Sequence, residues 1–235
     1  MSQWWHNACS DVLNSKFSAE YSAGEMKNLL VCEYMSGGTT MVTDLKNNDN
    51  LKLMKLVYPV AQLKTSARAA YDENAYISVV DVEVNNDYHT LCFFNNSFAD
   101  VELIFRLDNG TCGGYVDHMS TYNVSSYFSR EIHRDCKYDN ILKMGVIPAN
   151  SCEVVKIAKS NKPQVIMSDM HLSLGGEVEV KLDNKTVKIT GNNPFNCKGN
   201  YVIALPDGEI TTDGKREFSF SVNGSGPFSY NKNIR

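Results

Sequence analysis

Alternation of apolar and polar residues constrains this chain more than any other feature of its sequence. Residues 177–182 and 186–190 alternate around the polar triplet 183–185, a pattern that is typical of a β-hairpin with one buried face. The same alternation occurs in residues 76–84, where acidic residues separate the later apolar ones. Segments of this kind bury one face of a sheet and leave the other face in water, so the pattern predicts packed sheets.

Further strand candidates follow one another through the last two thirds of the chain, with polar turns between many of them. They are residues 89–94, 101–107, 123–129, 152–158, 164–167, 201–205 and 217–222. Many short strands at this spacing predict a mainly β fold, either a β-sandwich or a jelly roll.

The first third of the chain has a different pattern. Residues 11–21 carry apolar residues at helical spacing, residues 60–71 fit a second short helix, and residues 51–58 fit an irregular strand. The predicted domains are an N-terminal arm with short helices (1–72), a central β-sandwich (73–162) and a smaller C-terminal β domain (163–235).

Composition excludes several classes of partner. The chain has 235 residues and a formal net charge of −4, which provides no general attraction to nucleic acid or to an anionic membrane. No apolar run approaches the roughly 18 residues that span a bilayer, and the N-terminus does not resemble a secretory signal. We therefore predict no nucleic-acid partner, no membrane partner and synthesis in the cytoplasm, with possible later incorporation into a virion.

Cysteine and histidine spacing gives no sign of a metal or redox site. The seven cysteines are odd in number, and no two lie closer than 16 residues. This spacing is unlike that of zinc ribbons or redox Cys-x-x-Cys pairs, so reduced thiols are expected. The five histidines show no pairing two or four residues apart. The sequence predicts no cofactor and no metal.

Residues 132–142 resemble the catalytic loop of protein kinases. They contain His133-Arg134-Asp135, then Lys137 and Asn140. The resemblance implies that Asp135 takes a substrate proton and that Asn140 holds a metal ion.

The other parts that a kinase needs are missing. Residues 30–38 look like a kinase hinge, but only 29 residues precede them, and these contain one glycine, Gly24. A glycine-rich lobe does not fit in that length. No Asp-Phe-Gly metal site occurs in residues 155–161, where the resemblance would place it. We interpret the kinase-like fragments as coincidental.

Residues 109–114, Asn-Gly-Thr-Cys-Gly-Gly, resemble the nucleophile motif of viral chymotrypsin-like cysteine proteases. The resemblance implies Cys112 as the nucleophile and glycine backbone amides as an oxyanion hole. The general base would be His89, which lies only 23 residues upstream in a predicted hairpin. This leaves too little chain for the barrel that carries the base in that family, so a glycine-rich turn with an incidental cysteine is the favoured interpretation.

Residues 94–103 and 146–155 resemble small β-sandwich modules of phage and virus particle proteins and of surface adhesins. In these modules a strand opens with an Asn-Ser turn, and a late strand follows Ile-Pro-Ala-x-Ser. Here Pro148 fixes an extended entry and Ser151 can satisfy turn backbone before the strand. The resemblance implies a packing module and no particular chemistry.

Together these observations predict a non-catalytic structural or adhesive subunit of a larger assembly, such as a virus or phage particle. We expect the subunit to form a homo-oligomer, with Trp4 and Trp5 as interface residues. Two alternatives stay open. One is a cysteine protease that uses Cys112 and His89, and the other is a carbohydrate-binding β-sandwich with exposed tyrosine and asparagine on its loops.

Overall fold

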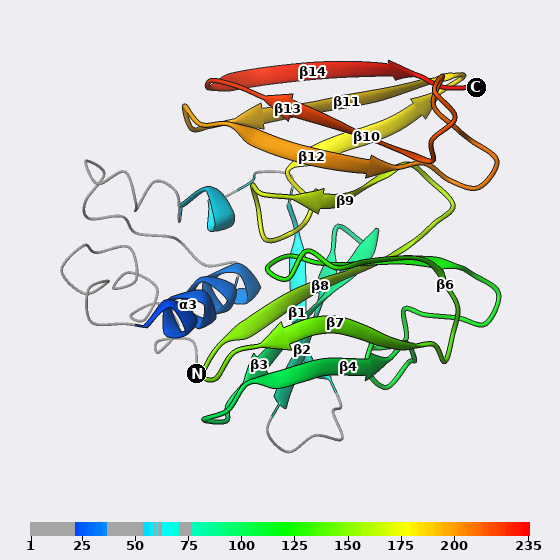
Figure 1. The fold of residues 1–235 in the computed structure, drawn as a ribbon. Helices are drawn as coiled ribbons and strands as arrows, with labels where there is room; N and C mark the ends of the chain where they lie inside the picture. Colours follow the sequence, from blue (N-terminus) through cyan, green and yellow to red (C-terminus); the bar gives the residue numbers. More distant parts are fainter. Residues whose placement is uncertain (1–21, 37–53, 59, 61–62, 71–76) are drawn as a thin grey trace.

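The computed structural model describes residues 22–36, 54–58, 60, 63–70 and 77–235. Trp4, Trp5 and the helix predicted at residues 11–21 lie outside the described residues. The described part is built mainly of antiparallel strands, with one helix of 14 residues near its start, α3 (Ala23–Ser36) (Figure 1). The predicted fold class, a mainly β sandwich with a short helical N-terminal segment, is confirmed.

The larger body is a six-stranded antiparallel sheet with a two-stranded sheet on one face. The six strands, in their order across the sheet, are β1 (Thr65–Ala70), β2 (Ile77–Val84), β3 (Tyr88–Asn95), β8 (Cys152–Lys159), β5 (Tyr122–Ser126) and β6 (Ile132–Cys136). The two-stranded sheet pairs β4 (Val101–Arg106) with β7 (Ile141–Ile147).

The smaller body is a sandwich of two three-stranded sheets, which lies above the first body in Figure 1. One sheet contains β10 (Val178–Asp183), β11 (Thr186–Asn193) and β14 (Gly226–Asn233), and the other contains β13 (Glu217–Val222), β12 (Gly199–Ala204) and β9 (Gln164–Ser168). The predicted hairpin forms β10 and β11, with Asp183 opposite Thr186 and Asn184 at a φ of 52° in the turn.

The six-stranded sheet is covered on both faces, which explains why its central strands are buried almost throughout. One face packs against β4 and β7, through residues such as Leu91, Leu103 and Met144. The other face packs against α3 and the loop around Leu172. Strands buried on both faces cannot show a polar alternation, and β3 and β8 accordingly have only one partly exposed residue each.

The N-terminal elements differ from those expected. Residues 65–70, within the predicted second helix, form strand β1, because the free edge of β2 pairs with them from Thr65–Val84 to Ala70–Val79. This pairing overrides the helix propensity of the alanines. A helical turn at residues 54–57 replaces the expected strand.

Helix α3 begins with a capping box that sequence reasoning overlooked. The Glu25 backbone N–H donates to Ser22 Oγ (3.3 Å), and the Ser22 N–H donates to Glu25 Oε2 (2.8 Å). These reciprocal bonds satisfy two N–H groups at the start of the helix. The kinase-hinge-like residues 30–36 are therefore helical, and their side chains from Leu30 to Met35 are buried.

Two neighbouring aliphatic residues of β7 provide a test of the packing between the sheets. Leu142 is 5% exposed in the core, whereas Ile141 is 67% exposed on the outer face. We expect Leu142→Ala to lower the free energy of unfolding by about 2–5 kcal/mol and Ile141→Ala to change it by less than about 0.5 kcal/mol. Urea denaturation of both variants measures the difference, and equal losses would contradict this packing.

Candidate functional site

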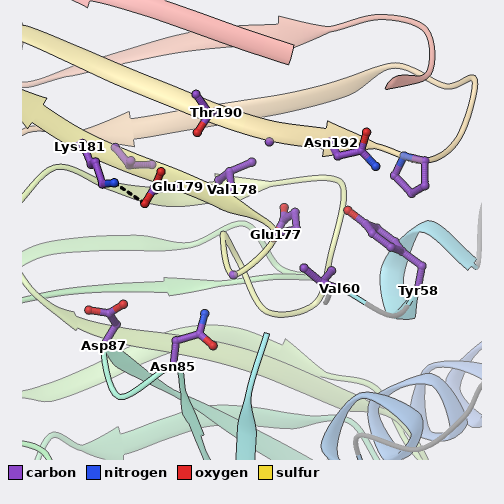
Figure 2. Close-up of a pocket in the computed structure, with 14 residues that line it drawn as sticks. Tyr58, Val60, Asn85, Asp87, Glu177, Val178, Glu179, Lys181, Thr190 and Asn192 are labelled. Atoms are coloured by element: carbon purple, nitrogen blue, oxygen red, sulfur yellow. Dashed lines mark ion pairs between the residues drawn. The ribbon is translucent and has the colours of Figure 1, made fainter. Parts of the chain in front are cut away.

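A cleft of about 830 Å³ lies between the C-terminal sandwich and one corner of the six-stranded sheet. Figure 2 shows its upper wall, formed by β10 and β11, and its lower wall, formed by the turn between β2 and β3. Tyr58 and Glu177 also line it. The cleft brings together residues that lie more than 100 positions apart in the sequence.

The upper wall follows from the strand alternation. Val178 and Val180 pack toward the C-terminal core, so Glu179 and Lys181 point outward and form an ion pair of 2.6 Å. The register places Thr190 opposite Glu179.

The lower wall is a tight turn with polar side chains. Asn85 and Asn86 adopt positive φ angles of 54° and 57°, as the two central residues of a type I′ turn do. Asn85 Oδ1 accepts a hydrogen bond from the Lys64 N–H (2.7 Å), and Asp87 forms an ion pair with Lys162. The turn therefore presents an amide and a carboxylate to the cleft.

Glu177 is the most unusual residue of the cleft because half of its carboxyl group has no partner. The residue is 7% exposed, and its Oε2 accepts hydrogen bonds from Ser173 Oγ and the Gly175 N–H, both at 3.1 Å. Its Oε1 is buried and accepts no hydrogen bond of standard geometry among the described residues, although the Tyr201 hydroxyl group lies close to this carboxyl group. Burial raises the pKa of this carboxyl group. An unsatisfied buried acceptor costs about 1–3 kcal/mol, so its persistence calls for an explanation.

Tyr58 has a second unpartnered polar atom in the same cleft. The residue is 7% exposed, and its hydroxyl group is buried without a hydrogen-bond partner in the described part of the chain. Its ring packs edge-to-face on His171 (5.3 Å between centroids) and on Phe195 (5.4 Å). These contacts fix the ring.

The loop before β10 holds Glu177 in place. The Ser173 N–H donates to His171 Nδ1 (3.0 Å), and Ser173 Oγ accepts from the Gly176 N–H (3.0 Å) while it donates to Glu177. Burial lowers the pKa of His171 to about 4, so its ring is neutral near neutral pH and can accept this bond.

Lys156 of β8 fastens this loop to the six-stranded sheet. Its Nζ donates to Val165 O (2.7 Å) and to Leu174 O (2.8 Å), and it lies 3.9 Å from the centroid of the Tyr88 ring. Burial lowers the pKa of Lys156 to about 7, and the nearby Glu177 carboxyl group opposes this shift. The hydroxyl group of Tyr88 donates to Ser173 O, which is a further bond to the same loop.

The residues of the protease-like motif lie elsewhere, around a buried aspartate. His89 Nδ1 is 2.6 Å from Asp81 Oδ1, and Arg68 Nε donates to Asp81 Oδ2 (2.7 Å). Cys112 is fully buried, and its backbone N–H donates to Asp108 O (2.9 Å). Burial and the charge of Asp81 raise the pKa of the Cys112 thiol, the opposite of what nucleophilic activation requires.

Two of the kinase-like residues, Arg134 and Asp135, make contacts between the two bodies. Arg216 donates to both carboxylate oxygens of Asp135 (2.8 and 3.2 Å), which lowers the pKa of that carboxyl group. Arg134 donates to Leu205 O and Arg216 O, both at 3.1 Å. Asn140 Oδ1 accepts from the Lys137 N–H (2.7 Å) within a turn.

The described residues also bear on metal binding, thiol state and membrane crossing. No group of three or more His, Cys, Asp or Glu side chains there is placed to hold a metal ion. The six cysteines of this part are free thiols. None of its helices has the length and apolar character needed to cross a bilayer.

Comparisons with known proteins give only distant similarities. No protein-family model matches the sequence, and no curated protein matches it. The chain is similar to the crystal structure of α-galactosidase I from Mortierella vinacea, with a TM-score of 0.49, 10% identity, and 62% of this chain aligned to 38% of that one. It is also similar to a putative α-N-acetylgalactosaminidase from Bacillus halodurans, with a TM-score of 0.46, 12% identity, and 59% aligned to 31%.

A third similar structure is a β-L-arabinopyranosidase from Geobacillus stearothermophilus, with a TM-score of 0.45, 14% identity, and 59% of this chain aligned to 31% of that one. The chain spans less than two fifths of the length of each of these three proteins.

The prediction of a structural or adhesive subunit of a virus or phage particle is contradicted. The similar structures named here are glycosidases, not particle components. The error has a physical reason. Alternation reveals which residues face out of a sheet, but not whether the outer faces of two sheets enclose a polar cleft.

Sequence reasoning missed Tyr58, Glu177 and Lys156. Lys156 did leave a signal, because it stands inside the apolar stretch 152–158, where a charged residue must find buried partners. No sequence pattern marks Glu177 and Tyr58, because the hydrogen bonding of their side chains depends on how distant segments pack.

Labelling of cysteines tests the placement of Cys112. We expect iodoacetamide to modify Cys112 more slowly than the half-buried Cys197 in the folded chain, since burial and a raised pKa both suppress the thiolate. Mass spectrometry of digested protein measures both rates, with urea-unfolded protein as the control. Faster labelling of Cys112 in the folded chain would restore the nucleophile hypothesis.

The pH dependence of stability tests the burial of Lys156. Because its pKa is lowered from 10.5 to about 7, the unfolded chain binds more protons than the folded chain between these pH values. The free energy of unfolding contributed by this group therefore increases with pH across that window. We expect urea denaturation to show the wild type gaining stability relative to Lys156→Met from about pH 7 to pH 9. Parallel profiles would contradict this.

Proposed function

We propose that the cleft binds a carbohydrate without cleaving it. The observation that carries the proposal is that two residues lining the cleft each have a buried polar atom without a hydrogen bond of standard geometry in the described structure, Glu177 Oε1 and the Tyr58 hydroxyl group. A ligand that offers several hydroxyl groups donates to the first atom and exchanges a hydrogen bond with the second. Binding then removes the desolvation penalty that the empty cleft retains.

The rest of the cleft suits a polyhydroxylated ligand. Its walls add the amides of Asn85 and Asn192, the carboxylates of Asp87 and Glu179, and the hydroxyl group of Thr190. These groups are acceptors, or both donors and acceptors, as sugar hydroxyls require. The volume of about 830 Å³ lies within the range of roughly 300–1,000 Å³ that is usual for small-molecule sites.

The arrangement of the carboxylates favours binding over hydrolysis. Most glycosidases place two carboxyl groups on either side of the scissile bond. In this cleft Asp87 is paired with Lys162, and Glu179 is paired with Lys181. Glu177 is left without a free second carboxylate among the described lining residues, so we assign it to ligand recognition.

Two conservative variants separate ligand binding from structural roles. Tyr58→Phe and Glu177→Gln should each weaken sugar binding at least about tenfold, because each alters one atom that receives the ligand. Tyr58→Phe should leave the stability of the ligand-free chain unchanged or slightly higher, since it removes a buried hydroxyl group that has no partner in the described structure. A glycan array followed by calorimetry on the best ligands measures affinity, and thermal unfolding measures stability.

Glu209→Gln is the matched control, because Glu209 does not line the cleft. It should bind sugars as the wild type does. The proposal fails if no glycan binds the wild type more tightly than about 10 mM, or if the bound sugar is unaffected by both cleft variants.

A further inference from the structure

A small recess of about 80 Å³ opens beside the cleft, with which it shares Asp87, Val178 and Val180. It lies where the chain crosses from β8 to β9, between the two bodies. At roughly 30 Å³ per water molecule, it has the volume of two or three waters, which corresponds to one substituent of a sugar ring.

Gln164 lines the recess and has an unused hydrogen-bond acceptor. This residue opens β9 and is 6% exposed. Its Nε2 donates to Lys159 O (2.7 Å), which fixes the orientation of the amide. Its Oε1 is buried and has no partner among the described residues. The recess is therefore short of one hydrogen-bond donor.

Most of the other lining groups are apolar or cationic, and Asp87 adds a carboxylate. Pro163, Val165 and Val178 form apolar wall, and Lys162 contributes an ammonium group. Lys162 forms a half-exposed ion pair with Asp87, and an ammonium group has three N–H donors, so its Nζ can also donate to a ligand. Lys156 also lines the recess, but its Nζ is already bonded to two carbonyl groups and lies over Tyr88.

We infer that this recess receives the acetamido group of an N-acylated amino sugar bound in the cleft. The amide N–H of the ligand donates to Gln164 Oε1, its carbonyl oxygen accepts from Lys162 Nζ, and its methyl group packs on the apolar wall. This inference rests on the proposed carbohydrate function and specifies the class of sugar.

Other substituents fit less well. A hydroxyl group satisfies Gln164 but leaves the walls formed by Pro163 and Val178 against water. A carboxylate can accept from Lys162 Nζ, but it cannot donate to Gln164 Oε1, and the Asp87 carboxylate also lines the recess. An N-acyl group has a donor, an acceptor and an apolar end on four heavy atoms.

Matched pairs of methyl glycosides test the inference with the full chain. The pairs are glucose with N-acetylglucosamine, galactose with N-acetylgalactosamine, and mannose with N-acetylmannosamine. Calorimetry should show the N-acetylated member of the best-binding pair to be at least about tenfold tighter. Saturation-transfer NMR should show its acetamido methyl group receiving more saturation than its ring protons.

Gln164→Met removes the acceptor and keeps the length of the side chain. It should reduce the preference for the N-acetylated sugar to less than about threefold while affinity for the parent sugar stays unchanged. Thermal unfolding verifies that the variant is folded, and the NMR result on the wild type stands independently of it. Equal affinities within every pair, or a weakly saturated methyl group, overturn the inference and leave the carbohydrate proposal standing. If no sugar binds at all, both fail.

Discussion

The burial of one amino group, that of Lys156, is the interaction on which the arrangement of the two bodies depends. It reaches from the six-stranded sheet to a carbonyl group of β9 and to one of the loop before β10. A buried amino group without partners would be destabilising in either protonation state, so the packing of both bodies has to bring these carbonyl oxygens and the Tyr88 ring to the same place. Lys156 also lines the recess, which opens beside the cleft.

The same contact explains how a polar site can be held rigid. Lys156 fixes Leu174, and the bonds among His171, Ser173 and Glu177 then orient the carboxyl group. A carboxyl group that is fixed in this way loses little side-chain entropy when a ligand arrives, so more of the interaction appears as affinity. The unsatisfied Oε1 and the Tyr58 hydroxyl group make the ligand-free chain less stable than its packing allows, as is common at functional sites.

Prediction from the sequence succeeded where local patterning decides structure. The hairpin of β10 and β11 follows from its alternation and its polar turn, and so does the mainly β fold class. Prediction was wrong where pairing with a distant segment determines the secondary structure. Residues 65–70 form a strand because they pair with the edge of β2. The cleft could not be predicted from the sequence for the same reason. Tyr58, Asp87, Glu177 and Asn192 meet across two bodies, and no spacing rule connects them.

A crystal structure of the chain grown with the sugar that binds most tightly tests the central claim most directly. The account predicts electron density for the sugar in the cleft, with one hydroxyl group within hydrogen-bond distance of Glu177 Oε1 and another near the Tyr58 hydroxyl group. Density for the sugar elsewhere on the surface, with Glu177 Oε1 and Tyr58 bonded to protein groups, would contradict it.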